Sequence, residues 1–255
     1  MALVRTDVLT EAIDDRAPLE HRHTPEAIRL RLAEGTRHSY VRDFIFGGID
    51  GAVTTFAVVS GAAGAELGAR VVLILGIANL VADGFSMAAS NYVATSAERD
   101  ELDHAAAVES RHIDTAPEGE REEVREIFRR KGIRGAALAE VVRQITADRD
   151  RWVATMLREE YGLPREVRSP MWAGVSTFGA FLLCGLVPLV PFVAGMARPF
   201  ALASLATAAV FLGVGAIKGR LSARGWWRSA LETLAIGSAA AAVAYAAGIL
   251  LKRLV

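Results

Sequence analysis

Five long runs of apolar residues divide the chain, at about 41–64, 70–96, 171–195, 199–217 and 228–251. Each run is close to the roughly 20 residues that an α-helix needs to cross the hydrocarbon core of a bilayer. Because a helix satisfies its own backbone hydrogen bonds in lipid, these runs predict an all-α membrane protein with five transmembrane helices. Pro188 and Pro191 are expected to kink or end the third of them.

A charged stretch at residues 97–169, which we call the charged insertion, separates the second and third apolar runs. Its apolar positions recur at intervals of three and four, which predicts about three amphipathic helices. We expect the second of these to begin with a capping box at Thr115 and to end near Gly132. The third is expected to bend near Asp148 and to stop at Gly162.

These patterns divide the chain into a cytoplasmic N-terminal segment (1–40), the first two transmembrane helices (41–96), a cytoplasmic three-helix domain (97–169) and transmembrane helices three to five (170–255). The basic residues set the orientation, since Arg37, Arg42 and the charged insertion would all face the cytoplasm. In the N-terminal segment, Glu20, His21 and His23 favour a solvated tail over a metal site.

The charge balance and the motifs narrow the function classes. The 255 residues carry 29 basic and 29 acidic side chains, so the formal net charge at pH 7 is zero. Without an excess of basic residues, nucleic acid is not expected as a main partner. The single cysteine, Cys184, excludes a disulfide within the chain. The sequence has no P-loop, nucleophile elbow or HExxH pattern, which argues against an enzyme.

Carboxylates lie inside the first two apolar runs. Asp43 and Asp50 are seven residues apart and share one face of the first predicted helix. In the second helix, four residues follow at four-residue steps and form one stripe, namely Asn79, Asp83, Met87 and Asn91. An ionised carboxylate in the hydrocarbon core costs roughly 3 kcal/mol or more, so such residues usually face a cavity or a partner and mark an ion path.

The donor atoms of this stripe favour a transition metal over an alkali ion. Carboxylate and amide groups with a thioether suit Fe(II) or another first-row divalent ion, whereas hard alkali ions gain nothing from sulfur. Met87 taken alone is more often core or lipid-facing filler. Gly47 and Gly51 predict a close helix crossing that would bring the acids together.

A proton route is compatible with the same acids. A dication favours the charged form of a carboxylate, whereas low dielectric favours the neutral form, so metal entry and proton release are coupled. Asp43 and Asp50 are expected to alternate between the two cations. Glu232 in the fifth run is a further embedded acid, and Arg228 and Lys218 lie near enough to predict a structural ion pair there.

The charged insertion carries a second set of candidate ligands at helical spacing, in the pairs Glu109 and His112, Glu120 and Glu123, and Met156 and Glu160. Three helices that each offer such a pair could surround divalent ions with carboxylate, imidazole and thioether groups. The alternative is that these acids are solvated and stabilise the first turns of helices through the macrodipole. Spacing alone leaves both interpretations open.

Several short segments match a known family in motif, order and spacing. They are Arg42-Asp43, Gly47-Gly48, Asp50-Gly51, Gly76-Ile77-Ala78-Asn79, Ala82-Asp83-Gly84-Phe85-Ser86-Met87 and Asn91-Tyr92. From about residue 37 to the C-terminus, the chain resembles the vacuolar iron transporter family. The resemblance implies a cytoplasmic metal-collecting domain between the second and third transmembrane helices. It also implies a translocation site lined by Asp50 and Met87 near a dimer interface.

The resemblance assigns the metal ligands of the charged insertion to Glu109, His112, Glu120, Glu123, Met156 and Glu160. His112 stands where Glu is usual in the family, and Leu157 stands where some members have a second Met. In the membrane, Asn79 stands where some members have Glu. We therefore hypothesise that Asp83, one turn before Met87, supplies the missing carboxylate.

These observations predict a divalent metal transporter that moves Fe2+, with Mn2+ as a second candidate, out of the cytosol. A metal/proton antiporter, a homodimer and no prosthetic cofactor are expected, with divalent ions, protons and the lipid bilayer as partners. The Ala- and Arg-rich chain favours the inner membrane of a bacterium, with the N-terminus in the cytoplasm. The alternative is a membrane-anchored metal sensor or storage protein, which would need no acids within its membrane helices.

Overall fold

The computed structural model describes residues 23–34, 39–164, 167–220 and 225–254. The chain forms two units, residues 1–39 and residues 40–255. In the first unit, α1 (Pro25–Glu34) begins with proline, whose fixed φ suits the first helical position. Glu20 and His21 lie outside the described residues, so the interpretation of the N-terminal tail stays a prediction.

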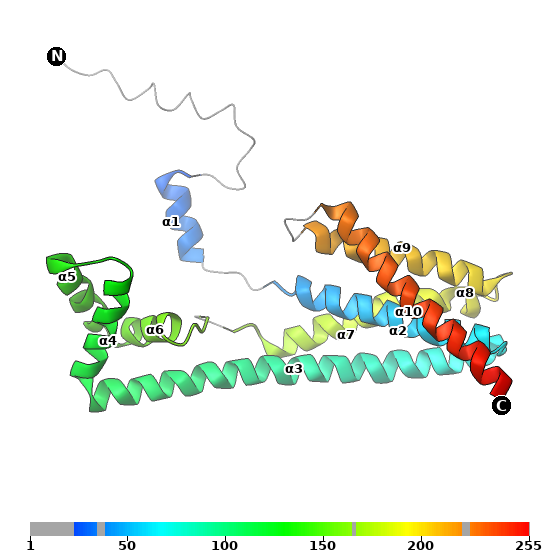
Figure 1. Cartoon of the computed structure of the whole chain (residues 1–255), viewed down its shortest axis with the longest axis horizontal. Coiled ribbons are helices and arrows are strands. Elements are labelled where there is room, and N and C mark those ends of the chain that lie inside the picture. Colours follow the sequence, from blue (N-terminus) through cyan, green and yellow to red (C-terminus); the bar gives the residue numbers. More distant parts are fainter. Residues whose placement is uncertain (1–22, 35–38, 165–166, 221–224, 255) are drawn as a thin grey trace, which may run out of the picture. The chain divides into compact units, whose positions relative to one another are not determined.

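Among the described residues of the second unit, five spans are long and apolar enough to cross a membrane (Figure 1). They are α2 (Val41–Gly64), α3 (Ala69–Thr115), α7 (Pro170–Leu186) together with α8 (Val190–Val193), α9 (Pro199–Arg220) and α10 (Trp226–Leu254). The described residues contain helices and no strands. The predicted all-α chain with five spans is therefore confirmed in length and composition.

A short 3-10 turn (Val187–Leu189) interrupts the third span between α7 and α8. Pro188 lies in that turn and Pro191 lies in α8. Neither proline nitrogen can donate the backbone hydrogen bond of an α-helix. The interruption predicted for the third span therefore occurs at these two prolines.

The second span is longer than its apolar part, because α3 continues to Thr115 while the apolar run ends near residue 96. No Gly or Pro occurs between residues 97 and 116, so nothing in the sequence ends the helix where its polarity changes. The 47 residues of α3 correspond to about 70 Å of helix. The first amphipathic helix of the charged insertion is thus the C-terminal part of α3.

The rest of the charged insertion forms three helices, α4 (Pro117–Arg130), α5 (Gly135–Thr146) and α6 (Arg149–Glu159). They pack on one another and on the C-terminal part of α3 (Figure 1). The predicted bend at Asp148 is a complete break, because its side chain caps α6 by accepting a hydrogen bond from Arg151 N at 2.8 Å. The capping box predicted at Thr115 is wrong, since its hydroxyl donates to the carbonyl of Arg111 at 2.8 Å.

Within the membrane part, α2 contacts α3, α7, α9 and α10. Gly47 and Gly51 of α2 face α7: a Cβ on Gly47 would meet the carbonyl oxygen of Thr177, and one on Gly51 would meet the backbone of Phe181. The close crossing predicted from these glycines is therefore made with α7 and not with the next helix in sequence. Small residues show that backbones approach closely, but they do not show which helix is the partner.

Among the residues that the structure describes, three hydrophobic clusters stabilise the second unit, two in the membrane part and one in the charged insertion. The bundle core consists of Phe56, Val59, Ala62, Val72, Leu80, Phe181, Leu189, Phe192 and Ala203. The insertion core consists of Ile113, Val124, Leu138, Val142, Trp152 and Met156. On the outside of the membrane part, Leu183, Leu205 and Val243 are 66%, 70% and 72% exposed. Large apolar side chains on the outer surface of long helices indicate contact with lipid.

Candidate metal sites

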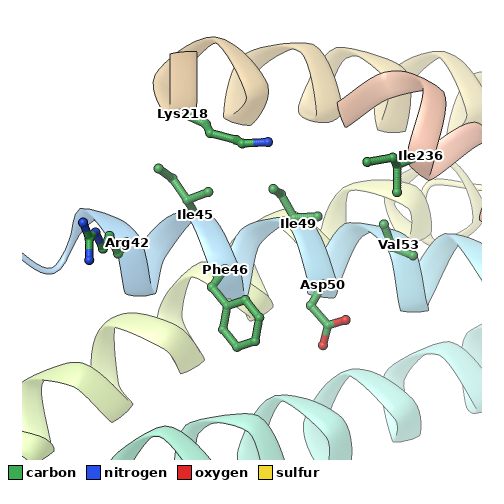
Figure 2. Close-up of a pocket in the computed structure, with 8 residues that line it drawn as sticks. All are labelled: Arg42, Ile45, Phe46, Ile49, Asp50, Val53, Lys218 and Ile236. Carbon is green, nitrogen blue, oxygen red and sulfur yellow. The ribbon is translucent and has the colours of Figure 1, made fainter. Parts of the chain in front are cut away.

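Two carboxylates from neighbouring helices approach each other in the membrane part. Asp50 of α2 is partly buried and points to the side of α2 on which α3 lies (Figure 2). The carboxylate of Asp83 in α3 is near enough for the two negative charges to interact. The side-chain amide of Asn79, one turn earlier in α3, donates a hydrogen bond to Asp83. The structure thus brings together three of the residues predicted for the path.

A cavity of about 560 Å³ adjoins Asp50, and its walls are formed by Arg42, Ile45, Phe46, Ile49, Asp50, Val53, Lys218 and Ile236. Figure 2 shows Ile45, Ile49 and Val53 on the opposite side of α2 from the Asp50 carboxylate. Among these lining residues, Asp50 alone carries a carboxylate. A carboxylate beside open space in an apolar helix bundle is what an ion path requires, since an ion can then approach its oxygens.

Met87 follows Asp83 by about one turn of α3 and is partly buried. Its side chain packs against the bundle core, which fits the alternative prediction that Met87 fills space in the core. The four-residue step also keeps the thioether on the same face of α3 as the acid. The role of Met87 as a metal ligand therefore stays a prediction.

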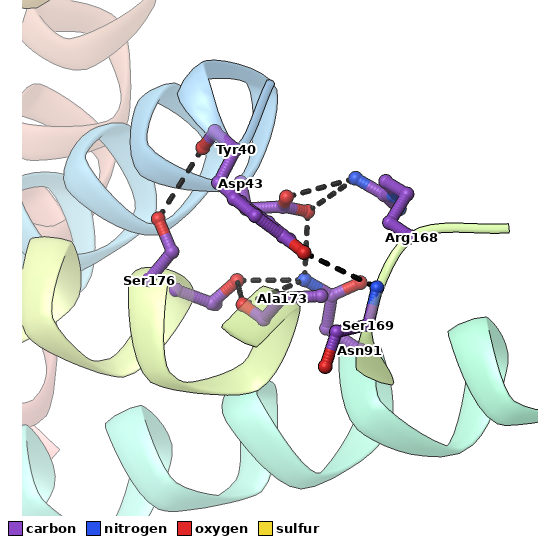
Figure 3. Close-up of polar contacts among 8 residues, drawn as sticks. Tyr40, Asp43, Asn91, Arg168, Ser169, Ala173 and Ser176 are labelled. Atoms are coloured by element: carbon purple, nitrogen blue, oxygen red, sulfur yellow. Dashed lines mark hydrogen bonds and ion pairs between the residues drawn. The ribbon is translucent and has the colours of Figure 1, made fainter. Parts of the chain in front are cut away.

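Asp43 has a different environment from Asp50. It is 5% exposed, and its carboxylate accepts hydrogen bonds from Arg168 at 2.8 and 2.9 Å and from Asn91 of α3 at 2.9 Å (Figure 3). Sequence analysis did not predict the pair with Arg168, which lies 125 residues later. The available signal was an arginine two residues before Pro170, and basic residues are common at that position relative to a membrane span.

Glu232, the further embedded acid in α10, has a cationic partner. Lys218 Nζ, near the end of α9, lies 3.5 Å from Glu232 Oε2. The predicted structural ion pair is therefore present, and Glu232 is accounted for without a place in the path.

The charged insertion gathers five of its six predicted ligands in one acidic cluster. Glu109 of α3 and Glu120 of α4 are 1% and 4% exposed. The imidazole Nδ1 of His112 lies 4.0 Å from Glu109 Oε1 and 3.4 Å from Glu120 Oε1. The negative charges of Glu123 and Glu160 also act on Glu120. Three separate helical segments therefore direct acidic groups to one place.

Burial and like charge dominate the electrostatics of this acidic cluster. Burial, followed by the charges of Glu109 and Glu123, raises the pKa of Glu120 to about 7. Burial and the same two charges raise the pKa of Glu160. Tyr161, which sequence analysis missed, donates its hydroxyl to Glu109 Oε1 at 3.0 Å, and burial raises its pKa to about 12. A bound dication would offset the repulsion that these acids share.

Two oxygens of the acidic cluster, Glu109 Oε2 and Glu120 Oε2, are buried without a hydrogen-bond partner among the described residues. Buried acceptors are normally satisfied, and a divalent ion would satisfy both. Met156, the sixth predicted ligand, is fully buried in the insertion core. Within the described part of the chain, no three His, Cys, Asp or Glu side chains already stand in a metal-holding geometry. Coordination therefore requires these side chains to close in around an ion.

Comparisons with known proteins identify the family of the chain. Residues 41–249 match a family described as the VIT family. A vacuolar iron transporter 2 of Oryza sativa subsp. japonica is 33% identical over 229 residues, which cover 86% of this chain and 93% of the relative. A vacuolar iron transporter 1 of Arabidopsis thaliana is 33% identical over 219 residues, covering 82% and 85%. A vacuolar iron transporter of Toxoplasma gondii is 33% identical over 232 residues, covering 86% and 77%.

The matched residues 41–249 contain the charged insertion and nearly all of the five candidate membrane spans. Similarity therefore covers both groups of acids, and it is not confined to one apolar segment. The resemblance inferred from the sequence motifs is confirmed, and the chain belongs to the VIT family.

Proposed function

We propose that the protein transports a divalent metal ion, Fe2+ with Mn2+ as a second candidate, out of the cytosol in exchange for protons. The relatives described above are named vacuolar iron transporters, which supports iron as the cargo. The observation that carries the proposal is the approach of Asp50 and Asp83 from two membrane helices, and Asp50 also lines a cavity. Helices that served only as an anchor would have no need of these acids.

The proton half of the proposal follows from the chemistry of this acidic pair. In low dielectric, two neighbouring carboxylates need a compensating positive charge. A dication and protons compete for the same oxygens, so the arrival of one releases the other. Asp50 and Asp83 would thus exchange a metal ion for protons in each cycle.

The charged insertion is proposed to collect metal ions on the cytoplasmic side. The unpartnered oxygens of Glu109 and Glu120 support this capture role. Arg42 begins α2, and Lys218 and Arg220 end α9, so the positive-inside rule favours a cytoplasmic location for the N-terminus and the insertion. The Ala- and Arg-rich composition favours the inner membrane of a bacterium.

The proposed transporter is a homodimer. Asp83 is exposed on α3, where Val81 and Phe85 are 55% and 68% exposed. A charged side chain that faces lipid is strongly disfavoured, so this face of α3 needs a cover that gives water access to the acid. A second copy over the same face would provide it, and the site of Asp50 and Met87 would then lie near the dimer interface.

Flux measurements on the full chain in proteoliposomes test the proposal. Fe(II) and Mn(II) uptake under an imposed pH gradient is compared for the parent, Asp50→Ala, and the double variant Glu120→Ala/Glu123→Ala. We expect loss of flux in Asp50→Ala and a weaker apparent affinity for metal in the double variant. Proton movement measured with a pH-sensitive dye should accompany metal movement in the parent.

Two matched controls make the result specific. Glu232→Gln removes an embedded acid that pairs with Lys218, and Glu122→Gln removes an exposed acid of α4 that pairs with Arg125. Both controls should keep parental flux. Metal binding without metal or proton flux in the parent would favour the membrane-anchored sensor or storage protein instead.

A further inference from the structure

The carboxylate of Asp43 accepts hydrogen bonds from two side chains, Arg168 and Asn91. One nitrogen of the Arg168 guanidinium lies 2.9 and 2.8 Å from the two carboxylate oxygens, and Asn91 Nδ2 lies 2.9 Å from Oδ1 (Figure 3). Arginine keeps its proton in proteins, and an amide NH2 is also a donor. The carboxylate therefore accepts every one of these bonds.

The same network ties α2 to α3 and to the start of α7. Besides Asp43, the Asn91 amide donates to Thr177 Oγ1 at 2.7 Å and to the carbonyl of Ala173 at 3.3 Å. Ser169 N, next to Arg168, donates to the Tyr40 hydroxyl at 3.2 Å. The positions of both charged partners are thus fixed by neighbouring contacts, and the pair is a built feature of the fold.

Asp43 and Asp50 belong to one polar seam between α2 and α3. Asp50 of α2 faces Asp83 of α3, and Asp43, two turns earlier in α2, faces Asn91, about two turns later in α3. The two helices run in opposite directions, so these pairs form two successive levels. Arg168 lies at the level of Asp43 and Asn91, just before α7 begins.

Exposure shows which partner of the ion pair can leave. The Arg168 side chain is 27% exposed and the Asp43 side chain is 6% exposed. Displacing Arg168 toward solvent therefore opens the pair without unfolding α2. A cation and a dication cannot occupy the same two carboxylate oxygens at once, so the arginine competes with any metal ion that binds Asp43.

We propose that Arg168 is a positioning residue that closes the seam at the end nearest the charged insertion. Its guanidinium pairs with Asp43 as an internal counter-cation. A metal ion binds Asp43 only when Arg168 moves away. This inference rests on the proposed transport function. It adds Arg168 to the residues predicted for the path, and it gives Asp43 a role distinct from that of Asp50. Asp50 exchanges cations within the membrane, and Asp43 is the acid at which the path opens.

The experiment measures initial rates of Mn(II) and Fe(II) uptake against metal concentration, with the full chain in proteoliposomes. The variants are Arg168→Gln, Arg168→Lys, Asp43→Asn and the double variant Asp43→Asn/Arg168→Gln. In Arg168→Gln the apparent KM for metal should fall about fivefold, because a larger fraction of Asp43 is free to bind. Arg168→Lys, which keeps the cation, should lower KM by less. In the Asp43→Asn background, loss of Arg168 should leave KM unchanged.

A control separates this effect from surface charge, since removing any nearby cation reduces repulsion of a dication. Arg228→Gln removes a cation of α10 that lies over the Trp227 ring, 5.2 Å from its centroid. It should leave KM within about twofold of the parent, because exposed charges are screened by salt. A fall in KM as large as that of Arg168→Gln would overturn the inference.

A purely structural role for Arg168 predicts a different result. Arg168→Gln and Arg168→Lys would then lower Vmax in proportion to the folded protein recovered, with KM unchanged, and this outcome would also overturn the inference. If Arg168→Gln is not recovered folded, Arg168→Lys alone decides through its KM. A parent without flux would remove the proposed function itself, whereas a transporting parent with unaltered KM in both variants removes only the role of Arg168.

Discussion

The chain has Asn79 where some family members have Glu, and exchanging Asp83 tests whether this acid, one turn later in α3, supplies the missing carboxylate. Asp83→Asn should lower metal flux as strongly as Asp50→Asn, because both carboxylates act on the same ion. A loss of about 1.4 kcal/mol or more in binding corresponds to about tenfold or more in apparent affinity. Asp100→Asn, an exposed acid further along α3, serves as the control. Near-normal flux in Asp83→Asn would remove this residue from the path.

If the charged insertion captures metal as proposed, Glu120 should make that capture depend on pH. Its pKa is raised to about 7, chiefly by burial, so below that pH a binding dication must displace a proton from Glu120. The Mn(II) affinity of the insertion should therefore fall as the pH falls below about 7, by up to about tenfold per pH unit for one displaced proton. Titration calorimetry between pH 5.5 and 8 on the full chain, roughly one unit either side of that pKa, measures the slope.

Glu120→Gln should flatten this dependence, since an amide has no proton to lose in that range. Glu122→Gln on the same helix should keep it, because Glu122 is exposed and pairs with Arg125. An equal slope in the parent and in Glu120→Gln would show that another group of the acidic cluster takes up the proton.

At the scale of whole elements, the contact of α2 with α7 depends on the absence of side chains. Gly51→Ala should destabilise the bundle by about 1–3 kcal/mol, because its Cβ would press on the backbone at Phe181. Gly179→Ala in α7 is the matched control, since nothing lies within 4 Å of the Cβ it would carry. Thermal unfolding in detergent compares the two, and equal melting temperatures would argue against tight packing at Gly51.

The elements were largely predictable, because apolar length and helical period report on one segment at a time. The five spans followed from this local information. So did the helical spacing that places Asp83 beside Asn79 and Glu120 beside Glu123. The length of α3 could have been predicted as well, since no Gly or Pro occurs between residues 97 and 116. We predicted that the second membrane helix ends near residue 96, where the sequence becomes polar. A change of polarity alone does not end a helix, and α3 continues to Thr115.

Partners far apart in the sequence were not predictable. Arg168 pairs with Asp43 across 125 residues, and Tyr161 binds Glu109 across 52 residues. Each contact depends on how helices pack in three dimensions, and no spacing rule within one helix reports on it. The same limit explains why the glycines of α2 indicated a close crossing but not that α7 is the partner.

At the scale of the whole molecule, the proposed homodimer places α3 of one copy against α3 of the other. In a Cys184→Ser background, Ser86→Cys on the exposed face of α3 should form a disulfide-linked dimer in membranes on mild oxidation. Leu205→Cys, on an α9 surface that is 70% exposed, should remain monomeric under the same conditions. Non-reducing electrophoresis separates the two. Cross-linking at Leu205→Cys but not at Ser86→Cys would place the dimer contact on α9.

The unbroken course of α3 has a consequence for how ions travel. Asp83 and Glu109 lie on this one helix, 26 residues or about 39 Å apart along its axis. No single side chain bridges such a distance, so in the proposed pathway an ion released by the insertion would have to travel along α3 before it meets Asp83. In that proposal the insertion would act as a tethered reservoir that enriches the ion near the bilayer.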